Sequence, residues 1–310
     1  MSIKPNYKVI LYYKYVKLEN PQEVLDWHKK FGAEHNLRGR ILIGDEGING
    51  TLAGTEESVN AYIEEMQKDK RFTDIDFKDS YYTNNPFPKL KIKYRKEIVT
   101  LGLEKDIDMS SAPKGTYLTP DELQERIEKG EKIQFVDARN NYEWKIGKFK
   151  NAILPDIENF RDFPEFLKKI ENLKDQTLVF YCTGGIRCEK ATAYALKQGF
   201  KNVYHIKGGI QRYAEKYPKG AFEGSMYVFD DRISIAFDKD PDRKVLTTCE
   251  YCGKSCDSYK NCFNAKCNKR IITCDDCYKK NNGFCCEDCK KEKYPRKDNA
   301  KFEKLIQDSR

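Results

Sequence analysis

The sequence lacks the long apolar segments of membrane and exported proteins. Its best apolar run, Val9–Val16, is interrupted by Lys14 and is far too short to span a bilayer. The first residues contain no apolar stretch followed by a small-residue cleavage site, so no signal peptide is expected. We therefore expect a cytoplasmic protein with no membrane partner.

Histidines and nucleotide-binding glycine motifs are also scarce. The chain has only 3 histidines, and His28 lies on the apolar face of a predicted helix, where packing is its more common role. An iron site of two histidines and one carboxylate is thus poorly supported. Gly47-Ile48-Asn49-Gly50 follows a strand but matches no dinucleotide or phosphate fingerprint, and is interpreted as a turn. We expect no nucleotide cofactor.

The composition favours a multidomain protein with an unusual distribution of cysteine. A chain of 310 residues, 39% hydrophobic and 13% aromatic, can form two or three cores. The net charge of +8 suits an anionic partner, but a lysine-rich solvated surface explains it equally well. Of 12 cysteines, all but Cys182 and Cys188 lie between Cys249 and Cys289. Without an export signal, such crowding indicates metal binding rather than disulfides.

Strand and helix patterns alternate in the first hundred residues. Their order, βαββαβ, predicts a ferredoxin-like α+β domain over residues 1–107. The predicted strands are Tyr7–Lys17, Arg40–Ile43, Thr51–Ala53, Ile75–Phe77 and Leu90–Val99, and the predicted helices are Pro21–Phe31 and Glu56–Lys68.

A polar linker at Asp108–Gly115 precedes a second alternating region, expected to be a parallel α/β domain over residues 114–220. Thr119 and Pro120 are a good N-cap and first residue for a helix. A possible hairpin at Tyr227–Phe237 leads into a cysteine-rich region, residues 221–310. The other predicted strands are Ile133–Asp137, Thr177–Tyr181 and Val203–Ile206, and the other helices are Phe163–Ile170 and Arg187–Gln198.

Cys182 stands at the carboxyl end of the buried strand Leu178–Tyr181 and just before a helix, where open α/β sheets bind ligands. Backbone amides of the loop, the helix N-terminus and Arg187 all favour a thiolate, so its pKa should be lowered. The alternative, a buried small residue at a strand end, is the usual fate of a cysteine. The combination of features favours a catalytic Cys182 and Arg187, joined by Thr183, Gly184, Gly185 and Ile186.

This loop, together with Phe135-Val136-Asp137-Ala138-Arg139 and Lys207-Gly208-Gly209-Ile210, resembles the rhodanese superfamily over about residues 114–218. Arg187 follows Cys182 by five residues, whereas phosphatase relatives need one residue more, so phosphatase activity is disfavoured. Asp137 and Arg139 are expected to be supporting residues of the Cys182 site. Arg139 and Glu143 are a candidate ion pair, with a structural or a substrate-binding role. Cys188 could resolve an oxidised Cys182 as a disulfide, although a core position is favoured.

The cysteine-rich region has the spacing of two tetrahedral zinc sites, with pairs of thiolates offered by single turns. Closed four-thiolate sites have no open position, so a structural role is expected. Disulfides or unligated thiols are the alternative, and which pairs share an ion stays open. Cys256 and one of Cys285 and Cys286 exceed eight ligands. The predicted ligands are Cys249, Cys252, Cys262, Cys267, Cys274, Cys277, Cys286 and Cys289.

Three motifs together resemble the tRNA uridine hydroxylase family: Gly39–Thr51, Cys182–Lys190 and Val228–Arg232. The resemblance spans nearly the whole chain. It implies oxygen-dependent conversion of wobble uridine 34 to 5-hydroxyuridine, with molecular oxygen as co-substrate and the tRNA anticodon stem-loop as partner. It also implies an acylphosphatase-like N-terminal domain and an essential Cys182, described for the family as a persulfide-type centre.

Two stretches interleave tyrosine and lysine, Tyr12–Tyr15 and Lys91–Lys96. They suit stacking on unpaired bases beside phosphate contacts, although a strand with one core face gives the same pattern more often. Two other functions stay open: a rhodanese-type sulfurtransferase carrying a cysteine persulfide, and a non-catalytic RNA-binding scaffold. No protein partner is predicted.

Overall fold

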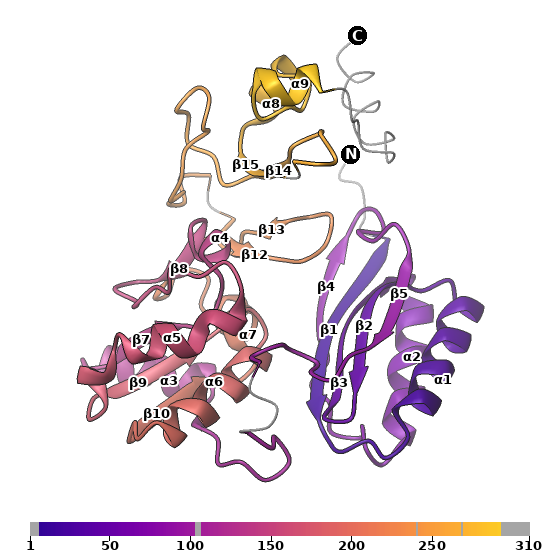
Figure 1. Ribbon diagram of the computed structural model, residues 1–310, viewed down its shortest axis with the longest axis vertical. Coiled ribbons are helices and arrows are strands. Elements are labelled where there is room, and N and C mark those ends of the chain that lie inside the picture. The colour runs from indigo at the N-terminus through magenta and orange to yellow at the C-terminus, as the bar shows by residue number, and fades with distance from the viewer. Residues whose placement is uncertain (1–5, 103–106, 240, 268, 293–310) are drawn as a thin grey trace.

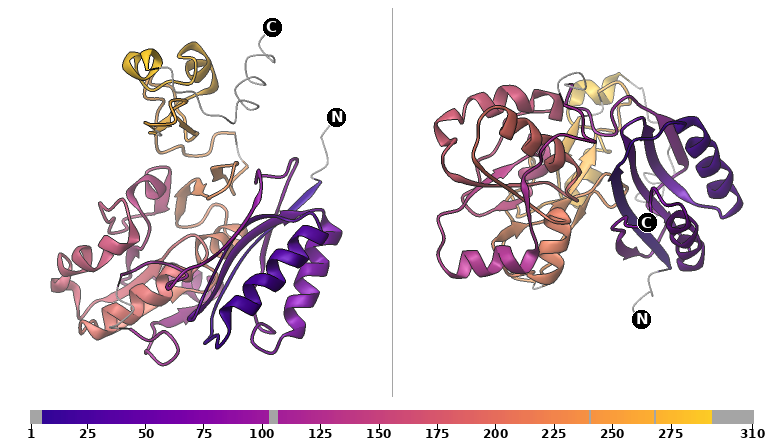
Figure 2. Two further views of the ribbon diagram at one scale, coloured as in Figure 1. Left: turned by 45° about the vertical axis from the view of Figure 1, so that its right-hand side comes forward. Right: turned by 90° about the horizontal axis from the view of Figure 1, so that it is seen from below.

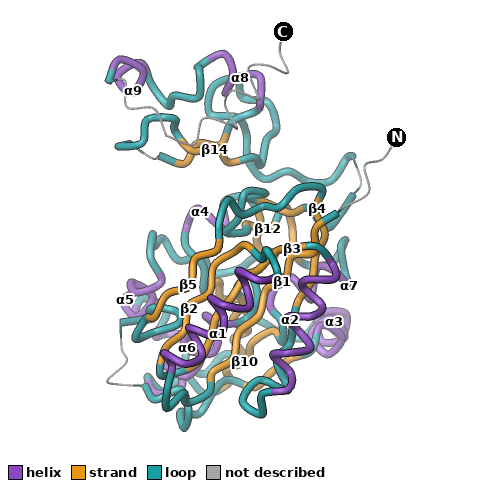
Figure 3. The backbone as a smooth tube through the Cα atoms, turned by 90° about the vertical axis from the view of Figure 1, so that its right-hand side faces the viewer, coloured by secondary structure: helices purple, strands orange, loops and turns teal. Residues whose placement is uncertain are grey.

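The computed structural model describes residues 6–102, 107–239, 241–267 and 269–292, which form three parts (Figure 1). The first is a sheet covered by two helices, and the second is a sheet between helices. The third is a small cysteine-rich region that lies at one end of the molecule in every side view (Figures 1, 2 and 3).

The N-terminal sheet has the strand order β4-β1-β3-β2-β5. Neighbouring strands are antiparallel, except that β5 runs parallel to β2. This is the ferredoxin-like arrangement with a fifth strand added at the edge, so the predicted α+β domain is confirmed. The strands are β1 (Tyr7–Tyr15), β2 (Arg38–Gly44), β3 (Gly47–Gly54), β4 (Lys78–Tyr82) and β5 (Leu90–Tyr94).

Helices α1 (Pro21–Glu34) and α2 (Glu56–Lys68) cover one face of this sheet (Figure 3). Because side chains alternate along a strand, Ile10 and Tyr12 of β1 join the core beneath these helices. Leu11 and Tyr13 are on the other face, which is turned toward the second part of the chain. Tyr12 is fully buried, so the core-strand interpretation of Tyr12–Tyr15 is confirmed for this residue.

One predicted strand is displaced. The segment Ile75–Phe77 precedes the observed strand, β4, instead of forming it. Ile75 is buried in the N-terminal core, and its amide donates to the carbonyl of Phe72 in a turn. Its apolar character therefore reflects packing, not strand pairing. The strand predicted at Leu90–Val99 is likewise shorter and ends at Tyr94.

The second sheet is fully parallel, in the order β6-β10-β9-β7. Alternation along β9 divides its neighbours between two cores: Phe180 packs with α5 and α6, and Tyr181 with α3 and α7. The predicted parallel α/β domain is confirmed. Its main elements are β6 (Thr116–Leu118), α3 (Pro120–Glu128), β7 (Gln134–Asp137), α5 (Phe163–Lys168), β9 (Thr177–Tyr181), α6 (Ile186–Lys197), β10 (Asn202–Ile206) and α7 (Gly209–Lys216).

Short elements complete the second part and build the third. A two-stranded sheet joins β8 to β11, and the hairpin of β12 and β13 begins at Met226, one residue before the predicted Tyr227–Phe237. These elements are α4 (Asn141–Trp144), β8 (Gly147–Phe149), η1 (Phe160–Asp162), η2 (Glu171–Leu173), β11 (Phe222–Gly224), β12 (Met226–Tyr227), β13 (Ser234–Ile235), β14 (Tyr259–Asn261), β15 (Arg270–Ile272), α8 (Asp275–Lys280) and α9 (Glu287–Lys291).

The segment predicted as a polar linker, Asp108–Gly115, packs against the second domain. Met109 is buried in the core that contains Phe180, and the Lys114 ammonium lies 3.3 Å from the Glu189 carboxylate. The two domains are therefore connected by a docked segment. Within the described residues, no helix combines the length and the apolar character needed to cross a membrane.

Candidate active site

The Cys182 loop connects β9 to α6 and folds around the cysteine sulfur. The amide of Gly185 donates a hydrogen bond to Sγ of Cys182 at 3.1 Å. Gly185 has a φ of 106°, a left-handed conformation that glycine adopts without strain. The predicted curled loop, with an amide directed at the sulfur, is present.

The loop also needs glycine because the N-terminal sheet lies directly on it. A Cβ on Gly184 would lie 2.7 Å from Cδ2 of Leu11, and one on Gly185 would lie 2.8 Å from the Tyr13 hydroxyl. Both distances are shorter than real carbon contacts allow. The first strand of the chain therefore forms one wall of the loop, a contact that local sequence patterns did not indicate.

The surroundings of Cys182 favour its thiolate. Burial raises the pKa of this thiol, but the hydrogen bond from the Cys188 thiol, the Arg187 guanidinium, and the amides of Cys188 and Gly185 together outweigh burial. The pKa falls from 9.0 to about 6, so the sulfur is mainly anionic at neutral pH. Cys188 itself is fully buried in the core beside Cys182.

Arg187 is held by Glu143, not left free over the sulfur. Nη2 of Arg187 lies 2.8 Å from Oε2 of Glu143, and both residues are buried. The Thr183 hydroxyl accepts a further bond from Arg187 at 3.3 Å. Glu143 thus fixes the guanidinium that stabilises the thiolate.

The predicted ion pair between Arg139 and Glu143 is wrong. Arg139 is fully buried and pairs with Asp137, with Nη2 2.7 Å from Oδ2, and it also donates to the carbonyl of Gly147 at 2.7 Å. The amide of Arg139 bonds to the same carboxylate, so residues two apart in the chain form a closed pair. Asp137 and Arg139 therefore form a closed buried pair, and the Arg139 guanidinium carbon lies 5.5 Å from the ring centre of Tyr181, the residue before Cys182.

Cys182 opens onto a cavity of about 420 Å³ between the two domains. The N-terminal sheet contributes the face opposite α1 and α2, and the second domain contributes the loop and the segment around η1. Phe229, on the β12–β13 hairpin, is 49% exposed at this cavity, and its ring lies 5.9 Å from the Arg187 guanidinium carbon. The polar wall residues include Arg40, Asn49, Arg95, Asn140, Asn159 and Arg161.

Buried ion pairs join the domains around this cavity. Nζ of Lys190, on α6, lies 2.9 Å from Glu46 and 2.6 Å from Glu97 of the N-terminal domain. Glu189, which precedes Lys190 on α6, accepts a hydrogen bond from the Tyr13 hydroxyl at 3.1 Å. Tyr13, Glu46, Glu189 and Lys190 belong to motifs singled out in the sequence, but their partners could not be predicted from it. The available signal was charge at Glu189 and Lys190 in a helix whose remaining face is apolar.

Lys78, on β4, is a further residue near the site that the sequence did not indicate. Lys78 is 2% exposed and lies 2.9 Å from Asp76 and 5.4 Å from the Tyr13 ring centre. Burial lowers its pKa, while Asp76 and the Cys182 sulfur oppose that change. The N-terminal domain thus adds a buried cation to the electrostatic surroundings of Cys182.

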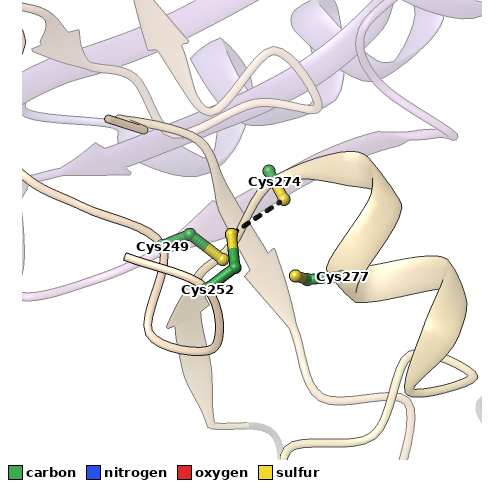
Figure 4. A group of neighbouring side chains, drawn as sticks. All are labelled: Cys249, Cys252, Cys274 and Cys277. Atoms are coloured by element: carbon green, nitrogen blue, oxygen red, sulfur yellow. Dashed lines mark hydrogen bonds between the residues drawn. The ribbon is translucent and has the colours of Figure 1, made fainter. Parts of the chain in front are cut away.

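Eight cysteines of the third part form two groups, each able to hold one metal ion. In the first, Cys249, Cys252, Cys274 and Cys277 point toward one another from a turn and from the start of α8 (Figure 4). The second group contains Cys262, Cys267, Cys285 and Cys289. Within each group, all sulfur atoms lie within 4.8 Å of one another. Along the chain, the first and third cysteine pairs thus form one group, and the second and fourth pairs form the other.

The predicted ligand set differs from these groups at one position. Cys285, predicted as surplus, belongs to the second group in place of the predicted Cys286. Cys286 is the exposed N-cap of α9, and its Sγ lies 3.8 Å from Sγ of Cys285, so it borders the second group without belonging to it. Cys256 belongs to neither group, as expected for a surplus cysteine.

The first cysteine group is connected to the active-site domain. Arg270, on β15, stacks on the ring of Tyr142 with 3.9 Å from guanidinium carbon to ring centre. Tyr142 precedes Glu143, the partner of Arg187. Hydrophobic contacts among Cys249, Tyr227 and Ile146 extend the same interface.

Comparison with known proteins assigns each part of the chain. Family models match a UPF0176 acylphosphatase-like domain over residues 7–98, a rhodanese-like domain over residues 119–216 and a rhodanese C-terminal region over residues 223–290. A protein of Staphylococcus epidermidis named tRNA uridine(34) hydroxylase is 43% identical over 289 residues, covering 92% of this chain and 89% of the relative. One of the same name from Chlamydia felis is 38% identical over 291 residues, covering 93% and 88%. A solved rhodanese-related protein from Thermoplasma volcanium is 24% identical, with a TM-score of 0.27, covering 33% of this chain and 92% of that one.

Proposed function

This chain belongs to the tRNA uridine(34) hydroxylase family, and from that premise we propose that it converts uridine 34 of tRNA to 5-hydroxyuridine with Cys182 as the reacting group. The observation that carries the proposal is a thiol whose pKa is about 6, placed at a cavity between two domains. Asn140 and Asn159 bring amide groups to the same cavity, and such groups suit the donor and acceptor edge of uracil.

The reaction that we propose begins with nucleophilic addition, which divides a difficult substitution into easier steps. The Cys182 thiolate forms a bond to C6 of uracil, and the C5–C6 π electrons move into an enolate over C5 and O4. The C5 atom forms a bond to molecular oxygen, and protonation gives a hydroperoxide. A dithiol-class reductant then supplies two electrons and two protons, releasing one oxygen atom as water. Loss of the C5 proton and departure of the thiolate give 5-hydroxyuridine.

The residues around the sulfur suit these steps. The Arg187 guanidinium, held in place by Glu143, stays positively charged throughout the reaction. It therefore stabilises the Cys182 thiolate both before it adds to C6 and after it leaves. The cavity lies between the domains, so the ring is removed from bulk water during the reaction. Gly184 and Gly185 leave room for the Leu11 and Tyr13 side chains of β1, which close one side of the loop.

Covalent trapping tests this mechanism. A stem-loop RNA with 5-fluorouridine at position 34 should form a stable protein–RNA adduct when oxygen and the reductant are present, because C5 then carries fluorine and a hydroxyl group and has no proton to lose as the thiolate departs. Mass spectrometry should locate the adduct on Cys182, and Cys182→Ala should form none. Detection of only an additional sulfur atom on Cys182, with no RNA attached, would count against addition to C6 and favour a persulfide.

Nucleoside analysis tests the activity itself. Transfer RNA from cells lacking the gene, or carrying Cys182→Ala, should lose 5-hydroxyuridine and the nucleosides derived from it. The rhodanese-like match over residues 119–216 favours a second candidate, sulfur transfer through a Cys182 persulfide, and loss of a thiolated nucleoside would support it. Unchanged nucleosides would support a non-catalytic RNA-binding scaffold.

We also propose that each cysteine group holds one structural zinc ion. Four thiolates at Zn–S distances of about 2.3 Å place neighbouring sulfurs about 3.8 Å apart. The observed separations are 3.8 Å for Cys252 and Cys274, and 3.7 Å for Cys267 and Cys285. Four protein ligands leave no open position, so the ion supplies folding free energy and not chemistry. Metal analysis of the purified chain should give about two zinc ions per molecule.

A further inference from the structure

Three arginines on the wall of the cavity, Arg40, Arg95 and Arg161, lack a carboxylate partner in the part of the chain that the structure describes. All three are exposed. Most other described arginines form ion pairs, namely Arg71, Arg126, Arg139, Arg187, Arg212, Arg232 and Arg243. Arginines left without carboxylates are thus concentrated at the cavity.

The acidic groups near the cavity are already engaged. Glu97, which lines it, accepts hydrogen bonds from Lys190 at 2.6 Å and from the amide of Leu101 at 3.0 Å. Glu143 neutralises Arg187. The remaining charge on the wall is therefore positive, and it belongs to the three unpaired guanidinium groups.

These guanidinium groups come from both domains. Arg40 is on β2 and Arg95 directly follows β5, so both belong to the N-terminal sheet. Arg161 is in η1 of the second domain. Because β2 pairs with β5 in the register Arg40↔Lys91 and Ile43↔Tyr94, Arg40 and Arg95 belong to neighbouring strands on the same side of the cavity. The third lies across the cavity, so an anionic chain entering it would meet cations from two sides.

We propose that Arg40, Arg95 and Arg161 form a phosphate clamp that grips the RNA backbone on both sides of the nucleotide in the cavity. The inference rests on the proposed function and adds the residues that position the substrate. A cavity of about 420 Å³ is within the usual range of small-molecule sites, about 300–1,000 Å³. It accepts one nucleotide, and the flanking phosphates stay at its rim. Guanidinium groups bind phosphate oxygens through two parallel hydrogen bonds.

Salt dependence of RNA binding tests the clamp. The full-length protein is titrated with an anticodon stem-loop RNA at several salt concentrations, and log K is plotted against log salt. Each lost phosphate contact should reduce the slope by about 0.7 for single-stranded RNA. We expect this reduction for Arg40→Gln, Arg95→Gln and Arg161→Gln. Arg38→Gln is the matched control, because Arg38 is on the same strand, β2, but does not line the cavity.

Neutral phosphate analogues then locate each contact. Stem-loops carrying one methylphosphonate, 5′ or 3′ of nucleotide 34, should bind the unmodified protein more weakly. A clamp predicts that Arg161→Gln is insensitive to one analogue, and that Arg40→Gln and Arg95→Gln are insensitive to the other. Equal slope changes for Arg38→Gln and the cavity variants, or analogue effects unchanged in all variants, would overturn the clamp.

The clamp and the proposed function fail separately. If tRNA keeps its 5-hydroxyuridine without the gene, while the cavity variants still lose slope, the hydroxylation proposal fails and the clamp stands. If Cys182→Ala abolishes 5-hydroxyuridine but the cavity variants bind RNA with the slope of Arg38→Gln, the clamp fails and the hydroxylation proposal stands. The rate of Cys182 alkylation in each variant checks that the loop is intact.

Discussion

Removal of the Cys188 thiol should raise the pKa of Cys182 measurably. After burial, the hydrogen bond from Cys188 is the largest influence on the Cys182 thiol, and it favours the thiolate. Hydrogen bonds to charged groups contribute about 1.5–3 kcal/mol, and one pH unit corresponds to about 1.4 kcal/mol. Cys188→Ala should therefore move the Cys182 pKa from about 6 upward by roughly one to two pH units.

The assay is the pH dependence of Cys182 alkylation by iodoacetamide, followed by peptide mapping to separate this residue from the metal-binding cysteines. The alkylation rate of the unmodified protein should rise with a midpoint near 6, and that of Cys188→Ala with a higher midpoint. Cys188→Ser is the matched control, since its hydroxyl still donates a hydrogen bond and should largely restore the low midpoint. An unchanged midpoint in Cys188→Ala, or equal midpoints for the alanine and serine variants, would refute this account of the thiolate.

Four other predictions follow from the geometry. Folding lowers the Cys182 pKa, so the thiolate contributes fully to the free energy of unfolding above the unfolded pKa of about 8.5, and this contribution is lost as pH falls through about 6. In chemical denaturation, the free energy of unfolding of the unmodified protein should therefore increase relative to that of Cys182→Ala as pH rises through this range. A difference between the two that does not change with pH would contradict this. Glu143→Gln leaves the buried Arg187 unpaired and should lower the free energy of unfolding by about 3–5 kcal/mol, whereas Glu143→Gln with Arg187→Gln should recover part of it; an equal or larger loss in the double variant would disprove the pairing argument. Cys285→Ser should reduce the zinc content by one ion while Cys286→Ser keeps both, and the reverse result would restore Cys286 as a ligand. Phe229→Ala should weaken stem-loop binding by about 1–3 kcal/mol through a lost base stack, with the similarly exposed Tyr81→Ala as control; equal effects of the two would exclude a specific stack.

The catalytic loop could be predicted because its signals are local. A buried strand, two glycines, an arginine and a helix start lie within ten residues of Cys182, and the structure arranges them as the sequence indicated. The ferredoxin-like domain was also predictable, since the apolar periods of its strands and helices match the elements that form. Its fifth strand and the place of β4 were less accessible, because Ile75 is apolar for packing and not for pairing.

Tertiary contacts account for most of what the sequence could not predict. The partner of Glu143 is 44 residues away in the chain, so the nearby Arg139 was the more obvious choice. Arg40 and Arg95 reach the cavity only because the N-terminal sheet docks on the loop, and no local pattern encodes docking. Cys285 could not be distinguished from Cys286 because the two cysteines are neighbours in the chain and their sulfurs lie only 3.8 Å apart.

Because of the buried charges of helix α6, the second domain should not fold stably without the N-terminal domain. Glu189 and Lys190 are 2% and 3% exposed, and their partners include Tyr13, Glu46 and Glu97 of the neighbouring domain. Without the N-terminal domain, Glu189 and Lys190 would lose these partners and leave unpaired charges on the helix. Domain shuffling in evolution, or truncation at the bench, must therefore carry both halves together, and heating should melt them in a single cooperative transition.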